Sequence, residues 1–207
     1  PRTTDHDNNS WSSCVRIVDA ANAETLCVEE IKNNERVVSI THAYFTKADE
    51  VLLVVGSAKN FVLQPRDCDG GMIRCYRYKR GSSNGETNGK SGGSKTITGL
   101  ELVHETVCEG APFAMRNFEG KLLVGVDDVL RMYDFGKKKL LRKSECAQKF
   151  PSFINSIRCS GDRFFVTDAC ESVFFVKFIR EEECSMHIFA DDVAPRYVTA
   201  MLPLDRD

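Results

Sequence analysis

The chain has 207 residues, of which 42% are hydrophobic and 28% charged, and its formal net charge is −2 at pH 7. These values are typical of a globular protein with one or two domains, and the near-neutral charge argues against strong overall attraction to a polyanion. No apolar run approaches the roughly 20 residues that a membrane-spanning helix needs, so we expect no membrane contact. Because the chain begins at Pro1 rather than Met and shows no signal-peptide pattern, we expect a piece of a longer protein.

The first half of the chain combines short apolar runs with polar connections. Residues 1–10 are polar and are predicted to form a disordered tail. Residues 60–69 hold Pro65, which disfavours a central strand. Residues 79–99 are rich in Gly, Ser and Asn and are predicted to be a flexible inserted loop. Strands are predicted at 11–20, 25–31, 37–45, 51–58, 72–78 and 100–107.

The second half is more regular and supplies the clearest hairpin. Apolar runs at 121–126 and 129–135 flank the short acidic pair Asp127 and Asp128, which is a hairpin signal. The same order of glycine, apolar strand, acidic turn and aromatic strand returns at 160–178. Strands are predicted at 111–118, 121–126, 129–135, 138–144, 153–159, 163–167, 172–179, 185–190 and 197–202.

The strands repeat at the spacing of propeller blades. Phe113 to Ile154 is a step of 41 residues, and Ile154 to Val198 is a step of 44. Four antiparallel strands per roughly 40–45 residues is the pattern of WD40-like blades. We therefore predict an all-β fold in which residues 11–207 form an incomplete β-propeller. It would hold about three blades plus strands of the flanking blades.

The sequence offers no catalytic constellation. It has no GxSxG, Walker, HExxH or GxGxxG motif, its four histidines are far apart, and Cys184 and His187 are only half of a zinc site. The nine cysteines are odd in number and lack a CxxC pair, which favours buried thiols in a reducing, intracellular compartment. We expect no enzyme activity, no cofactor, no metal ion and no small-molecule substrate.

The candidate contact residues are basic or aromatic side chains in two segments. The basic run is expected to be a solvated hairpin tip and edge strand, where lysines discourage pairing with other sheets. A contact with phosphate groups is the alternative. The second segment places an arginine beside a tyrosine, the residue types that anchor protein interfaces. The candidates are Lys137, Lys138, Lys139, Arg142 and Lys143 in the first segment, and Arg196 and Tyr197 in the second.

Three stretches resemble a known family. They are GKLLVGVDDVLRMYDFGKKKLLRK (120–143), IFADDVAPRYVTAMLPLD (188–205) and VVGSAKNFVLQPRDCDGGMIRCYRY (54–78). All three are similar to the CPSF A subunit family of triple-propeller proteins. That family includes a spliceosomal scaffold, the damaged-DNA-binding adaptor of cullin ubiquitin ligases and a cleavage and polyadenylation subunit. The similarity runs from about residue 11 to 205 and is greatest to the splicing member.

The resemblance implies a function that the residue pattern does not supply. It implies a C-terminal propeller segment of a nuclear, non-enzymatic scaffold of the splicing factor 3b complex, which recognises the intron branch site. The partners would be the HEAT-repeat subunit and the small subunit of that complex, with RNA contacted indirectly. Two alternatives remain open: an adaptor of the cullin-ligase or polyadenylation type, and a propeller that binds RNA directly.

Overall fold

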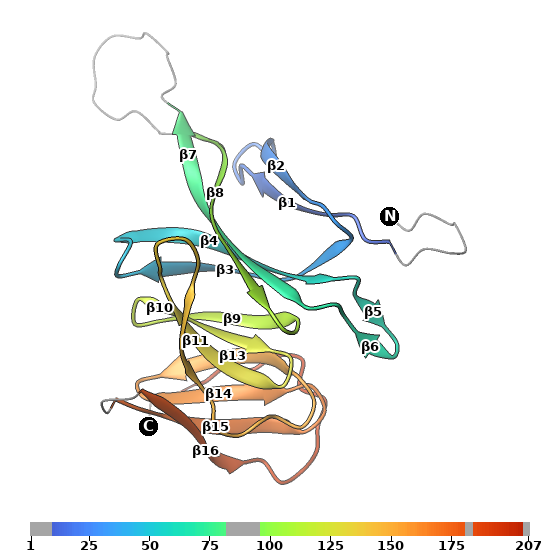
Figure 1. The fold of residues 1–207 in the computed structure, drawn as a ribbon, viewed down its shortest axis with the longest axis vertical. Coiled ribbons are helices and arrows are strands. Elements are labelled where there is room, and N and C mark those ends of the chain that lie inside the picture. The colour runs from blue at the N-terminus through green and yellow to red at the C-terminus, as the bar shows by residue number, and fades with distance from the viewer. Residues whose placement is uncertain (1–9, 82–95, 181–183, 205–207) are drawn as a thin grey trace.

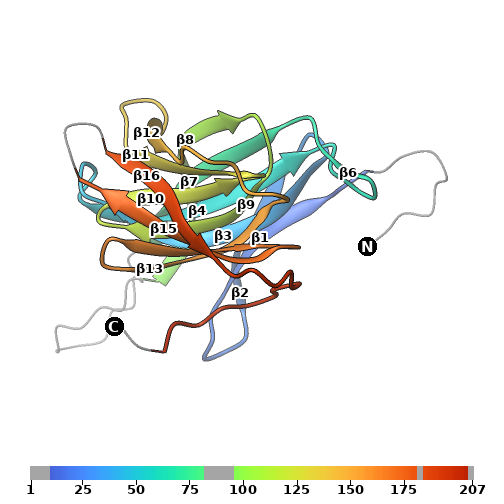
Figure 2. The same ribbon diagram turned by 90° about the horizontal axis from the view of Figure 1, so that it is seen from below.

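The computed structural model describes residues 10–81, 96–180 and 184–204, which form strands and no helix (Figure 1). Within these ranges no helix is long and apolar enough to cross a membrane. The strands build three four-stranded antiparallel sheets and a two-stranded ribbon, which lie one above another in Figure 1. Figure 2 shows the same layers from below. The predicted all-β, propeller-like fold is confirmed.

The ribbon and the first sheet come from the N-terminal half. The ribbon pairs β1 (Ser13–Val18) with β2 (Thr25–Ile31). A small hairpin, β5 (Val62–Leu63) with β6 (Arg66–Asp67), fills the connection between the second and third strands of the first sheet and carries a cis Gln64–Pro65 bond. The first sheet consists of β3 (Glu35–Phe45), β4 (Glu50–Lys59), β7 (Gly71–Gly81) and β8 (Thr96–Cys108).

The second and third sheets come from the C-terminal half, and each follows chain order from one edge to the other. The second sheet consists of β9 (Pro112–Phe118), β10 (Lys121–Val126), β11 (Val129–Asp134) and β12 (Leu141–Glu145). The third sheet consists of β13 (Ile154–Ser160), β14 (Arg163–Asp168), β15 (Ser172–Ile179) and β16 (Ser185–Asp191). Each sheet therefore is one blade-like unit.

Strand β10 shows why the sheets stack. Leu122 and Val124 belong to the core shared with the first sheet, whereas Leu123, between them, belongs to the core shared with the third sheet. Successive side chains of a strand point to opposite faces, so both faces of the second sheet are buried. Gly125 is required on the third-sheet side, because a Cβ there would lie 2.5 Å from the Ile154 side chain.

Aromatic side chains dominate the core between the second and third sheets. Phe164 is fully buried, with its ring centroid 4.7 Å from that of Phe118 in an edge-to-face arrangement and 5.9 Å from that of Phe178. Phe118 and Phe178 also meet edge to face at 5.4 Å. These rings come from β9, β14 and β15, so the cluster ties the two sheets together.

The first two sheets each contain the same cross-strand pair of an arginine and a glutamate. On β7, Arg74 donates to Glu105 of β8 at 2.8 Å and to Glu35 at 2.6 Å. On β11, Arg131 donates to Glu145 of β12 at 2.7 Å. Each arginine lies on the third strand of its sheet, and each cross-strand glutamate lies on the fourth. The internal repeat of the chain therefore extends to these polar side chains.

Burial of Glu35 disfavours its charged form, but hydrogen bonds from Arg74 and Ser57 outweigh that effect and lower the pKa of Glu35 below its usual value. Ser57 Oγ donates to the carboxylate at 2.5 Å. The carboxylate is therefore ionised and paired inside the protein, where losing its charge would leave Arg74 less well compensated.

Some predicted boundaries are wrong. The strand expected at 138–144 begins at Leu141, because residues 135–140 form the turn. That turn is tight, since a Cβ at Gly136 would lie 2.3 Å from the Lys139 carbonyl oxygen. No strand forms at 197–202, where the backbone carbonyls bond to side chains instead of to a strand partner.

The inserted segment is partly regular. Residues 79–81 extend β7 and residues 96–99 extend β8, paired through Lys79 and Gly99. Residues 82–95 of the predicted flexible loop, and residues 1–9 of the predicted tail, lie outside the described residues. Flexibility there stays a prediction.

We predict that Phe164→Ala lowers the free energy of unfolding by about 3–5 kcal/mol, because it removes a buried ring and leaves a cavity between two sheets. Phe189→Ala is the matched control, since that ring is 55% exposed, and should cost less than about 1 kcal/mol. Urea unfolding followed by circular dichroism measures both values. Equal losses would contradict the burial of Phe164.

We also predict that Glu35→Gln destabilises the protein in a pH-dependent way. Because the folded pKa of Glu35 is lowered, the stabilisation by its charge is present above the unfolded value of about 4.3 and is lost as pH falls through the folded pKa. The gap in unfolding free energy between wild type and variant should therefore be widest near neutral pH and narrow in acid. Urea unfolding over a pH series tests this, and a constant gap would contradict it.

Candidate interaction surfaces

The three predicted lysines at the hairpin tip lie in the turn between β11 and β12. Lys137, Lys138 and Lys139 are exposed. No described acidic side chain forms an ion pair with any of them. The strand that follows, β12, is the edge of the second sheet, as the sequence predicts. The lysines are therefore free to contact a partner in solution.

Arg142 and Lys143 extend this basic segment along the edge strand. Both side chains are exposed, and Arg142 Nη1 lies 3.1 Å from Glu145 Oε2. Glu145 is also the partner of Arg131, so Arg142 is tied to the repeated network of the second sheet. Such an exposed pair contributes little to stability, and Arg142 stays accessible.

Arg196 and Tyr197 lie in the irregular segment after β16. Arg196 forms an ion pair with Asp192, and its carbonyl oxygen accepts a hydrogen bond from the Ser172 backbone N–H at 3.2 Å. A backbone hydrogen bond from Ala194, with the Ser172 hydroxyl and Arg196, lowers the pKa of Asp192. Tyr197 is 85% exposed and presents its ring to solvent.

The two predicted segments lie at opposite ends of the strands. The Ile154 N–H donates to the Asp127 carbonyl, and Ile154 pairs with Asp168, so the β10–β11 and β14–β15 turns share one end. The Arg196 carbonyl oxygen accepts its hydrogen bond from the Ser172 N–H at that same end. The lysine turn closes the other end of β11. The structure does not bring the two segments into one site.

The third sheet has one face that no other sheet of the described residues covers. Its opposite face forms the core with the second sheet. On the uncovered face Phe165 of β14 meets Phe175 of β15 edge to face at 5.6 Å, and Phe175 lies 6.3 Å from Phe189 of β16. Phe165 and Phe175 are half-buried. A row of three aromatic rings on a sheet face is typical of a packing surface.

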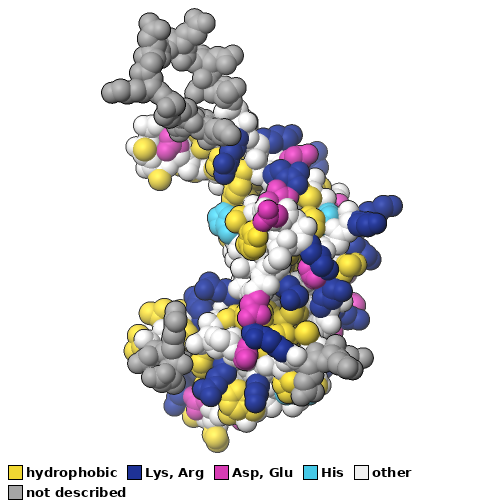
Figure 3. Space-filling model, turned by 90° about the vertical axis from the view of Figure 1, so that its left-hand side faces the viewer, with side chains coloured by type: hydrophobic (Ala, Val, Ile, Leu, Met, Phe, Trp, Pro, Cys, Tyr) yellow, Lys and Arg dark blue, Asp and Glu magenta, His cyan; other side chains and the backbone are white. Residues whose placement is uncertain are grey.

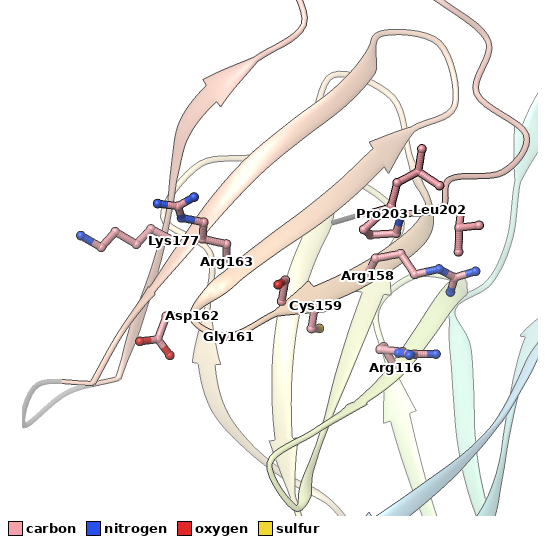
Figure 4. A pocket seen from close by; sticks show the side chains of 11 residues that line it. Arg116, Arg158, Cys159, Gly161, Asp162, Arg163, Lys177, Leu202 and Pro203 are labelled. Carbon is pink, nitrogen blue, oxygen red and sulfur yellow. The ribbon is translucent and has the colours of Figure 1, made fainter. Parts of the chain in front are cut away.

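A groove follows the inner strands at the edge of this face (Figure 4). Its cationic side chains are Arg116 of β9, Arg158 of β13, Arg163 of β14 and Lys177 of β15. In Figure 4, Arg116 and Arg158 lie on one side of the groove, and Arg163 and Lys177 lie on the other. The face shown in Figure 3 also carries Lys and Arg side chains over its lower half.

The irregular C-terminal segment forms one wall of this groove. Asn155 Nδ2 donates to the Val198 carbonyl oxygen, and Arg158 Nε donates to the Met201 carbonyl oxygen at 3.2 Å. Leu202 and Pro203 then line the groove. Two side chains of β13, three residues apart, thus hold an extended stretch of polypeptide through its backbone.

Sequence reasoning missed this groove because its cations are scattered. Two of them could have been identified by aligning the second and third sheets as repeats of each other. Arg116 pairs with Leu123 and Arg158 pairs with Phe165, so both members of the second pair lie 42 residues after those of the first. Equivalent positions of neighbouring inner strands therefore both hold arginine.

The thiol beside these arginines is not activated. Burial raises the pKa of Cys159 to about 11, although Arg116 and Arg158 favour its ionised form. A thiol with so high a pKa is protonated at neutral pH and is a poor nucleophile. Among the described residues, no group of three or more His, Cys, Asp or Glu side chains is placed to hold a metal ion.

Comparison with known proteins gives a consistent match. A protein-family model described as the CPSF A subunit region matches residues 12–207. The chain is 39% identical over 203 residues to Spliceosome-associated protein 130 A of Arabidopsis thaliana, a match that covers 97% of this chain and 15% of that protein.

Other relatives are similar to the same extent. Pre-mRNA-splicing factor RSE1 of Mycosarcoma maydis is 40% identical over 199 residues, covering 96% of this chain and 15% of the relative. Splicing factor 3B subunit 3 of Danio rerio is 37% identical over 201 residues, covering 97% and 15% respectively. The chain thus spans about 15% of the length of these curated relatives.

We predict that Asn155→Ala loosens the C-terminal segment. The change removes the donor to the Val198 carbonyl and the acceptor for the Thr167 hydroxyl. Trypsin cleavage after Arg196, followed by mass spectrometry, should become severalfold faster as the segment opens more often. Asn22→Ala is the control, since Asn22 bonds only within an exposed turn to Asp19. An unchanged cleavage rate would contradict the holding role of Asn155.

Proposed function

The chain belongs to the CPSF A subunit family, and from this membership we propose that it is part of a non-enzymatic scaffold that acts in pre-mRNA splicing. The observation that carries the proposal is the match over residues 12–207 to proteins named as splicing factors. The stack of blade-like sheets is compatible with it, because such sheets form rigid surfaces that display their turns to partners.

In the intact protein, we propose, a further sheet covers the open face of the third sheet. The row formed by Phe165, Phe175 and Phe189 leaves apolar surface in water on this chain alone. The curated relatives are several times longer than this chain, which leaves ample polypeptide for additional blades. Residues 11–207 would then be one arc of a larger propeller.

The partners would be protein subunits of the splicing factor 3b complex, among them its HEAT-repeat and small subunits, in the nucleus. Branch-site recognition would involve RNA through the assembled complex rather than through this chain. Arg196 and Tyr197 would be contact residues, since an exposed aromatic ring beside an arginine is typical of interface anchors. The relatives, which are named as spliceosomal and splicing proteins, favour splicing over the cullin-adaptor and polyadenylation alternatives.

Direct contact with RNA is the second candidate function. One observation favours it: Lys137, Lys138 and Lys139 are exposed, and no described acidic side chain pairs with them. Each phosphate contact would make the RNA affinity salt-dependent. Arg142 and Lys143 would extend the same surface along β12.

The test is purification of the tagged intact protein from nuclear extract, with the bound proteins identified by mass spectrometry. We expect splicing factor 3b subunits, and an Arg196→Ala/Tyr197→Ala variant should recover several-fold less of at least one of them. A Lys137→Ala/Lys138→Ala/Lys139→Ala variant serves as the control and should recover the same set. Recovery of a cullin or of the polyadenylation machinery in place of splicing proteins would refute the splicing assignment.

The same triple-lysine variant separates the second candidate. If the lysines contact phosphates, its affinity for a single-stranded RNA probe should fall and the salt dependence should become weaker. Equal affinity and equal salt dependence in wild type and variant would refute direct RNA binding by this turn.

A further inference from the structure

The β5–β6 hairpin is a feature of the first sheet that the other two sheets lack. Residues 60–70 join the second and third strands of the first sheet, whereas short turns at 127–128 and 169–171 make that connection in the other sheets. Figure 1 shows the hairpin beyond the ends of the four-stranded sheets. Its tip carries Leu63, which is 59% exposed. Ordering such an insertion costs conformational entropy and closes no sheet, so its role lies elsewhere.

An arginine fixes the hairpin against the neighbouring sheets. Arg66 pairs with Leu63 in the hairpin, and its guanidinium carbon lies 3.7 Å from the ring centroid of Phe153 and 5.7 Å from that of Phe113. Phe113 belongs to β9 of the second sheet, and Phe153 directly precedes β13 of the third. The insertion in the first sheet is therefore held by rings of the other two sheets.

This stacking leaves the hydrogen-bond donors of Arg66 available. The side chain is exposed and forms no ion pair with a described acidic residue. A guanidinium that stacks on a ring keeps the N–H groups at its edge free, and because its position is already fixed it loses less freedom on binding. An arginine on an aromatic ring beside an exposed leucine has the composition of an interface anchor.

One turn connects this anchor to the predicted contact residues after β16. The Ala169 N–H donates to the Phe153 carbonyl oxygen at 3.0 Å, and the Ser172 N–H donates to the Arg196 carbonyl oxygen at 3.2 Å. Residues 169–171 form the β14–β15 turn between these two hydrogen bonds. Arg66 and Arg196 therefore lie at the same end of the strands, opposite the lysine turn.

The charges at this end favour a protein over RNA as the ligand. Asp67 is exposed next to Arg66. Burial raises the pKa of Asp127, and the charges of Asp128 and Asp67 raise it further, although a backbone hydrogen bond and Arg66 act in the opposite direction. Carboxylates thus surround the arginine, and they would repel the closely spaced phosphates of a nucleic acid.

We propose that this end of the stack binds one partner protein through two anchors, Arg66 with Leu63 and Arg196 with Tyr197. The partner would place apolar side chains against Leu63 and Tyr197 and hydrogen-bond acceptors against Arg66. The proposal rests on the proposed function in taking Arg196 and Tyr197 as contacts; it adds the second anchor and requires both to bind the same protein. The hairpin lies at strand ends, so a further sheet over the third sheet leaves it accessible.

The experiment compares the proteins that the tagged, intact wild type and its variants recover from nuclear extract. Arg66→Ala should recover several-fold less of the same protein that Arg196→Ala/Tyr197→Ala loses. That protein, once purified, is the binding probe, and Arg66→Ala should weaken its affinity at least about tenfold. Arg66→Lys keeps the charge but lacks the planar fork, so it should weaken binding as well. The control is Arg142→Ala, which removes an exposed arginine at the other end and should bind as the wild type does.

A second variant tests the tip without touching packed residues. Leu63→Asp changes an exposed side chain and should weaken binding of the same probe several-fold. Leu141→Asp is its control, since Leu141 is 41% exposed beside the lysine turn, and should leave the affinity unchanged. Urea unfolding establishes that all variants are folded. Unchanged affinity in Arg66→Ala and Leu63→Asp would overturn the proposal, and so would equal weakening by the controls.

The shared surface and the splicing role can fail separately. If the Arg66 and Arg196/Tyr197 variants lose the same protein and it is not a splicing factor, the surface stands and the splicing assignment fails. If the wild type recovers splicing proteins and the two variants share no loss, the surface is refuted and the splicing assignment stands.

Discussion

Burial between neighbouring sheets is the constraint on which the rest of this structure depends. A four-stranded sheet has two faces, and the second sheet turns apolar side chains to both: Leu122 and Val124 to one side, and Leu123 to the other. Neither face would be stable in water. The second sheet therefore needs the first and third sheets, and the stack is the smallest arrangement that satisfies it. The ring cluster around Phe164 is the densest example of this dependence.

The same constraint separates the structural residues from those available to partners. The buried pair of Arg74 and Glu35 lies inside the stack, where it pairs charges that the fold encloses. The lysine turn and Tyr197 lie at opposite ends of the strands, where no packing is required of them. Binding residues in proteins are concentrated on connections that a rigid framework positions, and these turns have that setting. The basic groove differs from these turns, because most of its side chains lie on strands and their positions follow from the strand pairing.

Much of the fold could be predicted from the sequence, since the strands repeat and their turns carry local signals. The hairpin around Asp127 could be predicted because aspartate is typical of tight turns. The structure shows the reason: Asp127 adopts a positive φ of 46°, which aspartate tolerates better than most residues. The strand expected at 197–202 was wrong, because an apolar run does not reveal whether a backbone partner is present. The groove was not predictable from local charge density: Arg116, Arg158 and Lys177 are far apart in sequence, and they line one groove only because β9 packs beside β13 and β14 joins β13 to β15. The proposed function rests on the family resemblance, since no residue cluster specifies splicing.

The central claim is that these sheets are consecutive blades of a larger propeller in a splicing scaffold. A cryo-electron microscopy structure of the intact protein bound to its splicing partners tests that claim most directly. We expect three consecutive four-stranded blades with the register seen here, a further sheet over Phe165 and Phe175, and partner density at Tyr197. An isolated stack with the third sheet open to solvent, or a different strand order, would contradict the claim.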